Sequence, residues 1–108
     1  ILLIPEPMVA TGGTIDKLFQ VYAEMDAVEP AMAILMAMIV TPEALRLLTS
    51  KYPKLRIHAA RLDRGMSDQD VLNFMPGMYP DRERGLTDTD YIGPGAGGVG
   101  ERTNNTRK

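Results

Sequence analysis

Three short segments of this chain, at residues 1–4, 31–40 and 55–62, are mostly apolar. Short apolar runs bounded by turn residues are typical of buried strands in a parallel sheet. We therefore predict a strand in each of the three segments. Residues 31–40 are rich in Ala and Met, and a buried helix is the alternative for that run.

Two helical patterns separate these segments. Apolar side chains at positions 15, 18, 19 and 22 recur every three to four residues and form one stripe along a helix. In the second pattern Thr41 is a favourable N-cap, Pro42 suits the first helical position and Glu43 favours the positive end of the helix dipole. The second helix should end near Tyr52 and Pro53.

The order strand, helix, strand, helix, strand with short links predicts an α/β fold, a parallel sheet flanked by helices. In open sheets of this kind, ligands bind beyond the carboxyl ends of the strands. The turn after the first strand and the segment after residue 62 both reach that edge. His58 falls in the middle of the third strand, where we expect a packed or surface histidine without a catalytic role.

The turn after the first strand has the composition of a phosphate-binding loop. Glu6 follows the apolar run, and Ala-Thr-Gly-Gly-Thr at residues 10–14 leads into the first helix. A helix start carries several N–H groups without an intrahelical partner and the positive end of the dipole. The two glycines let the backbone approach an anion closely, and the two threonines add hydroxyl donors. The pattern suits a phosphomonoester, and a generic glycine-containing turn is the alternative.

The sequence Glu-Pro-Met-Val-Ala-Thr-Gly-Gly-Thr at residues 6–14 resembles the phosphoribosyl-diphosphate (PRPP) signature of type I phosphoribosyltransferases, most closely in the uracil phosphoribosyltransferase family. The family's usual acid at the first position is Asp. The resemblance implies a phosphoribosyltransferase-like fold with Glu6 as the catalytic residue. It assigns PRPP binding to Glu6, Pro7, Met8, Val9, Ala10, Thr11, Gly12, Gly13 and Thr14. It covers only the second half of such a protein, so we expect residues 1–108 to be the carboxyl-terminal part of a longer domain.

A near-repeat follows the third strand. Asp-Arg-Gly-Met-Ser-Asp at residues 63–68 recurs as Glu-Arg-Gly-Leu-Thr-Asp at residues 83–88, twenty positions later. The family runs from one acid-rich turn almost directly into Tyr-Ile-Val-Pro-Gly, and only the second copy keeps this short spacing to Tyr91. We therefore predict an insertion at about residues 67–86, in which residues 71–82 form a loop or hairpin. A lid, an oligomer contact and a neutral surface loop are its alternative roles.

Residues 91–102, Tyr-Ile-Gly-Pro-Gly-Ala-Gly-Gly-Val-Gly-Glu-Arg, contain a Gly-x-Gly-x-x-Gly pattern. A dinucleotide-binding unit does not fit, because only eight residues follow Gly100. The segment resembles the uracil-recognition loop of the same family, in which backbone N–H and C=O groups contact the edge of the base. Gly98 stands where the family has an Asp that contacts the PRPP side of the site, so one polar contact is lost. The resemblance assigns uracil binding to Ile92, Gly97, Gly98 and Val99.

The resemblance implies transfer of phosphoribose from PRPP to N1 of uracil, which yields UMP and diphosphate in pyrimidine salvage. The partners are then the small molecules PRPP and uracil, and Mg²⁺ arrives bound to PRPP without protein ligands of its own. We expect a homo-oligomer. The alternative is a non-catalytic relative that acts as a nucleotide-binding or structural subunit.

Composition and charge exclude several classes of function. The chain has 108 residues, a formal net charge of −2 and no cysteine. This charge provides no basic field for nucleic acid, and the lack of Cys excludes thiol catalysis and Cys-ligated metals. The longest apolar run, residues 31–40, is too short to span a bilayer, and no signal peptide is recognised, so we expect a cytoplasmic location.

Overall fold

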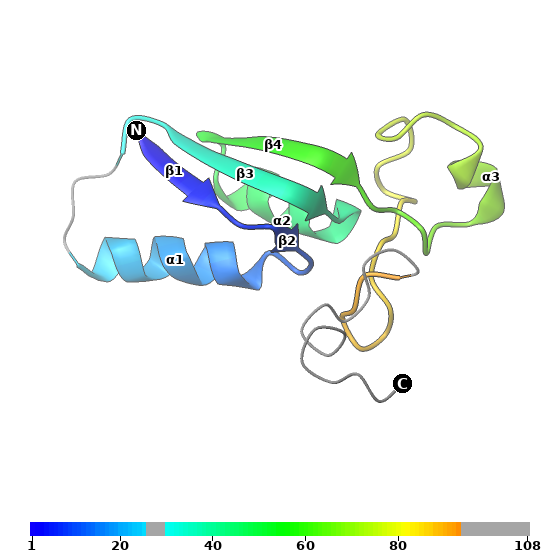
Figure 1. Cartoon of the computed structure of the whole chain (residues 1–108), viewed down its shortest axis with the longest axis horizontal. Helices are drawn as coiled ribbons and strands as arrows, with labels where there is room; N and C mark the ends of the chain where they lie inside the picture. Colours follow the sequence, from blue (N-terminus) through cyan, green and yellow to red (C-terminus); the bar gives the residue numbers. More distant parts are fainter. Residues whose placement is uncertain (26–29, 94–108) are drawn as a thin grey trace.

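The computed structural model describes residues 1–25 and 30–93, and Figure 1 shows a sheet with two long helices packed along it. Within these ranges, no helix is long and apolar enough to cross a membrane. The predicted α/β class is confirmed. In chain order the elements are β1 (Leu2–Pro5), β2 (Met8–Val9), α1 (Gly13–Glu24), β3 (Ala33–Val40), α2 (Pro42–Lys51), β4 (Leu55–Leu62) and the short α3 (Gln69–Leu72).

β3 is the central strand of a four-stranded parallel sheet. β1 and β2 pair with one side of β3, and β4 pairs with the other. β2 resumes the sheet after a short break, and Val9 lies opposite Val40 at the carboxyl end. At the break, the N–H groups of Met38 and Ile39 both donate to the carbonyl oxygen of Pro7, at 3.1 and 3.0 Å. Two residues facing one acceptor make a bulge, which lets the sheet bend at this point.

Both long helices cover the same face of the sheet. Each connects two neighbouring parallel strands in the same direction, and right-handed crossovers then place both helices on one side, as Figure 1 shows. The core between the layers is centred on Leu35, which is fully buried with Ile15 of α1 and Leu48 of α2. Phe19 stacks on Tyr52 with ring centroids 4.4 Å apart, and this contact joins the two helices.

Most of the predicted elements are confirmed, with small shifts at their ends. The predicted run 31–40 forms a strand, β3, from Ala33 rather than a helix, because β3 meets its backbone hydrogen-bonding needs in strands on both sides. α1 begins at Gly13, two residues before its apolar stripe. Thr41 caps α2 as predicted, and its hydroxyl oxygen accepts a hydrogen bond from the Ala44 N–H at 3.1 Å. His58 lies within β4 and is exposed.

The segment that we predicted to be an insertion, defined here as residues 64–83, leaves the sheet after β4 and returns beside its own starting point. Gly65 and Arg84, one in each repeat copy, form a parallel bridge, and the Arg84 N–H donates to Ser67 Oγ at 2.8 Å. Of the two alternatives predicted for residues 71–82, the loop is the one observed, since turns follow the end of α3 at Leu72. The segment contains one helical turn, α3, and it closes by parallel pairing because the chain circles back in its original direction.

Candidate functional site

The glycine turn predicted to bind phosphate lies between β2 and α1, past the carboxyl end of the sheet (Figure 1). Gly12 is the N-cap of α1 and has a left-handed backbone, with φ at +85°. The Gly13 N–H donates to Thr11 Oγ1 at 3.1 Å, and the Asp16 N–H donates to the Gly12 carbonyl at 3.0 Å. Thr11, Gly13 and Thr14 are exposed, so an anion can reach the first turn of the helix.

Two features require glycine at position 12. Its positive φ is unfavourable for a residue with a side chain, and an added Cβ would lie 3.2 Å from Leu47 Cδ2 and 3.4 Å from Leu48 Cγ. The turn therefore packs closely on α2. At Gly13 the nearest atom to an added Cβ is Thr11 Oγ1, at 3.3 Å, and the backbone there is not left-handed.

Thr41 also holds this turn, although the sequence pattern identifies it only as a helix cap. It is fully buried, its N–H donates to the Val9 carbonyl at 3.1 Å, and its hydroxyl donates to the Ala10 carbonyl. The same hydroxyl oxygen accepts the Ala44 N–H that caps α2. The contact with Ala10 has no sequence signal, because the two residues are 31 positions apart.

Glu6 lies further from the edge of the sheet than the predicted strand end implies. β1 ends at Pro5, but β2 continues the sheet through Val9, so only residues 10–14 of the predicted PRPP segment lie past the last strand pair. Glu6 occupies the break between the two strands, half-buried, with its N–H bonded to the Met36 carbonyl at 3.1 Å. A strand of two residues has no measurable period, so the sequence pattern misses it.

The structure describes the base side of the predicted site as far as Gly93. Ile92 is buried and pairs with Leu86 in an antiparallel bridge, and the Gly93 N–H donates to the Gly85 carbonyl at 3.0 Å. The Glu43 carboxylate accepts the N–H groups of Gly85 at 3.0 Å and Leu86 at 3.2 Å. This contact ties the segment to the start of α2. The other residues predicted to bind uracil lie outside the described ranges: Gly97, Gly98 and Val99.

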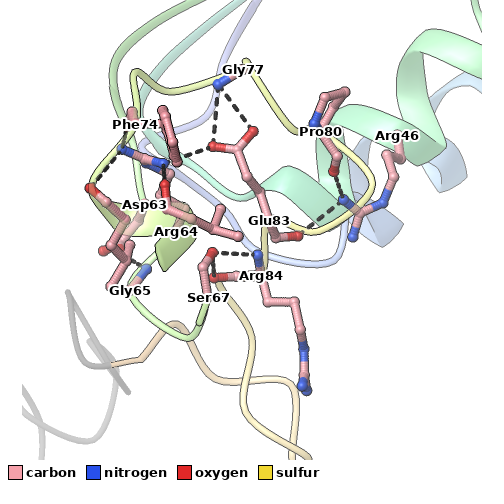
Figure 2. Close-up of polar contacts among 12 residues, drawn as sticks. Arg46, Asp63, Arg64, Gly65, Ser67, Phe74, Gly77, Pro80, Glu83 and Arg84 are labelled. Atoms are coloured by element: carbon pink, nitrogen blue, oxygen red, sulfur yellow. Dashed lines mark hydrogen bonds and ion pairs between the residues drawn. The ribbon is translucent and has the colours of Figure 1, made fainter. Parts of the chain in front are cut away.

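The insertion is held by a buried ion pair (Figure 2). The Arg64 guanidinium lies 3.3 Å from the Glu83 carboxylate, which also accepts the Gly77 N–H at 2.9 and 3.1 Å. Arg46 of α2 donates to the carbonyl oxygens of Pro80 and Glu83, at 2.6 and 3.0 Å. These contacts fasten the insertion to α2, beyond the carboxyl end of β4.

One further carboxylate is buried at the end of β4. Asp63 is almost fully buried and accepts the Gly65 N–H at 3.3 Å, and its Oδ2 has no hydrogen-bond partner within the described part of the chain. Across residues 1–25 and 30–93, no three His, Cys, Asp or Glu side chains converge where a metal ion could bind. A single carboxylate does not make a cation site.

The opposite edge of the sheet carries a cavity of about 470 Å³, lined in part by Phe19, Tyr22 and Tyr52. Beside it, Asp16 accepts the Tyr52 hydroxyl at 2.5 Å and the Lys51 ammonium at 3.1 Å. The Tyr52 hydrogen bond, followed by that of Lys51, lowers the pKa of Asp16. Burial, followed by the bond to Asp16, raises the pKa of Tyr52 to about 12. The cluster ties α1 to the end of α2.

The chain is similar in sequence to known proteins of one family. The sequence profile of the uracil phosphoribosyltransferase family matches residues 1–82. The chain is similar to the uracil phosphoribosyltransferase of Nostoc sp. (strain PCC 7120), at 32% identity over 77 residues, which are 71% of this chain and 34% of that protein. It is similar to the protein of the same name from Dictyostelium discoideum, at 26% identity over the same shares of both chains.

A solved structure supports the fold. The AQ2163 protein from Aquifex aeolicus matches 93% of this chain and 38% of its own, with a TM-score of 0.61 and 24% identity. The chain spans about a third of the length of the curated relatives it matches. The profile match includes the whole sheet, both long helices and the glycine turn between β2 and α1. On this evidence the chain belongs to the uracil phosphoribosyltransferase family, a family of transferases.

Proposed function

We propose that this chain binds PRPP and uracil as part of an enzyme that transfers phosphoribose to uracil, which yields UMP and diphosphate. The observation that carries the proposal is the turn at residues 10–14, which opens at the positive end of α1 with Thr11, Gly13 and Thr14 exposed. Its sequence resembles the PRPP signature of the family. The family match supports the class of reaction. We assign the reaction to pyrimidine salvage in the cytoplasm and expect a homo-oligomer.

In this proposal the 5′-phosphate of PRPP binds at residues 10–14. The N–H groups in the first turn of α1 donate to phosphate oxygens, and the lack of a side chain at the exposed Gly13 lets the anion approach closely. Thr11 accepts the Gly13 N–H and donates its own hydroxyl proton to the phosphate. Thr14, which is exposed, adds a second hydroxyl donor.

The chemical step requires positioning and charge stabilisation rather than a nucleophile of the protein. N1 of uracil forms a bond to C1′ of the ribose while the bond from C1′ to diphosphate breaks, and the proton of N1 passes to solvent. Positive charge develops on the ribose as the bond to diphosphate breaks, before the bond to N1 is complete. The Glu6 carboxylate hydrogen-bonds the ribose hydroxyls and stabilises that charge. We assign Mg²⁺ to the diphosphate as its counter-charge.

A non-catalytic nucleotide-binding or structural subunit is the second candidate. Gly98 favours it, because the related enzymes carry an Asp there that contacts the PRPP side of the site. Turnover separates a nucleotide-binding subunit from an enzyme, and binding separates both of them from a purely structural subunit.

Calorimetric titration of UMP and PRPP tests the phosphate turn. We expect Gly12→Val to lose UMP binding, because the new side chain strains a left-handed residue and contacts α2. Gly77→Val is the matched control and should bind UMP like the wild type, since Gly77 has φ at +88° with open space around an added Cβ. Equal UMP affinity in the wild type and Gly12→Val would reject the proposal.

Two further measurements complete the test. Gly13→Val places a side chain on the exposed face of the turn, where an added Cβ has only Thr11 Oγ1 within 4 Å, at 3.3 Å. It should therefore weaken UMP binding with a smaller loss of unfolding free energy than Gly12→Val. Binding of both ligands without formation of UMP from PRPP and uracil would favour the non-catalytic nucleotide-binding candidate. A wild type that binds neither ligand would favour the structural subunit.

A further inference from the structure

We propose that the first turn of α2 sets the spacing between the two halves of the proposed site. Thr41 holds the phosphate turn, and Glu43 holds the segment that leads to the predicted uracil loop. Both are positioning residues, since neither contacts the ligand in this proposal. The consequences for ligand binding rest on the proposed function, whereas the anchoring itself rests only on contacts within the chain.

Thr41, the N-cap of α2, makes two hydrogen bonds to the chain just before α1 and one within α2. Its N–H bonds to the Val9 carbonyl, its hydroxyl donates to the Ala10 carbonyl, and the same oxygen accepts the Ala44 N–H. All of these contacts are made by a residue with no exposed surface. Loss of the hydroxyl would leave the Ala44 N–H and the Ala10 carbonyl without this partner. The position of the turn therefore follows the position of the α2 N-terminus.

Glu43 joins the base side to the same helical turn. Its carboxylate accepts the N–H groups of Gly85 and Leu86, which are both buried and need an acceptor. Gly85 and Leu86 in turn pair with Gly93 and Ile92, so the anchor extends to the first residue predicted to bind uracil.

Thr41 and Glu43 are two residues apart at the start of one helix, where each residue advances the chain by about 1.5 Å. The two halves of the site are far apart in sequence, but both are fixed to this one rigid element. UMP needs both halves at the correct separation, whereas a fragment of UMP needs only one. Loss of one anchor should therefore weaken binding of the fragment that occupies the half it holds. Loss of either anchor should weaken binding of UMP.

Titrations with ribose 5-phosphate, uridine and UMP test this. We expect Thr41→Val to weaken ribose 5-phosphate binding about tenfold and to leave uridine binding unchanged. Glu43→Ala should weaken uridine binding about tenfold and leave ribose 5-phosphate binding unchanged. Both variants should weaken UMP binding. Thr41→Ser and Glu43→Gln, which keep an acceptor oxygen, should recover most of the affinity. Thr49→Val is the matched control and should change none of the three affinities, because Thr49 is exposed and its hydroxyl donates within α2 to the Leu45 carbonyl.

Amide hydrogen exchange in the absence of ligand tests the two anchors independently of the proposed function. Thr41→Val should speed exchange at residues 10–14 and leave residues 85–93 unchanged, and Glu43→Ala should do the reverse. Equal acceleration in both regions, or none in either, would overturn the inference. If the exchange pattern is as expected but the wild type binds neither ribose 5-phosphate nor UMP, the anchoring stands and the proposed function fails.

Discussion

Arg64 and Glu83 form an ion pair between the two copies of the repeat, with Nη1 3.3 Å from Oε2 and side chains only 12% and 2% exposed. Arg64 also donates to the carbonyl oxygens of Val71 and Phe74, at 2.9 and 2.5 Å. Its equivalent in the second copy, Arg84, is exposed. Copies of similar sequence therefore differ in role. The first supplies the buried cation, and the second supplies the carboxylate that neutralises it.

Glu83→Gln should lower the free energy of unfolding by about 3 kcal/mol, because loss of one partner leaves the other charge of a buried pair uncompensated. Asp70→Asn is the matched control in the same insertion. Asp70 pairs with Arg82 at 2.7 Å, but both side chains are at least half exposed, so its loss should change stability little. Urea unfolding compares the variants, and similar losses in the two would contradict the importance of burial.

Gly85→Ala should lower the free energy of unfolding by about 3 kcal/mol or more, because the added Cβ would lie 2.0 Å from the Asp63 carbonyl oxygen. The obstacle is backbone, which cannot move aside as a flexible side chain can. Gly77→Ala adds a Cβ in open space at a left-handed residue and should cost only about 1 kcal/mol. The midpoint temperature of thermal unfolding should be much lower for Gly85→Ala than for Gly77→Ala. The reverse order would show that the repeat copies do not pack as described.

Tyr52→Phe should remove a pH-dependent part of the stability. The pKa of Asp16 is lowered in the fold, so its contribution is present above its ordinary value of 3.8 and is lost as the pH falls below it. The pKa of Tyr52 is raised from 10.0 to about 12, so its contribution is complete below pH 10.0 and is lost as the pH rises toward 12. The difference in unfolding free energy between wild type and variant should therefore be constant between these limits and shrink outside them.

A double-mutant cycle with Asp16→Asn checks the cause of that difference. If the hydrogen bond between the two side chains carries the effect, the double variant should be more stable than the sum of the single losses predicts. Additive losses would assign the effect of Tyr52→Phe to its packing on Phe19 instead.

Deletion of residues 64–83 should leave a folded chain. The insertion returns to its starting point, where Asp63 lies against Gly85, so Asp63 can be joined directly to Arg84. The main apolar loss is the buried side chain of Val71, which costs about 2 kcal/mol. Circular dichroism and urea unfolding would check that the shortened chain folds. Loss of a cooperative transition would show that the insertion is required for the fold.

The order of the three longer strands and the two long helices followed from the sequence by itself, because it depends on local periodicity and on caps such as Thr41. The short β2 and α3 did not. The glycine turn at residues 10–14 and the family were also predicted from a continuous stretch of residues. Contacts between residues far apart were decided only by the tertiary structure. Examples are the hydroxyl of Thr41 on Ala10, the Glu43 carboxylate on Gly85, and the parallel closure of the repeat. A local pattern records which face of an element is apolar, but the partner of a buried polar group is set by how the elements pack.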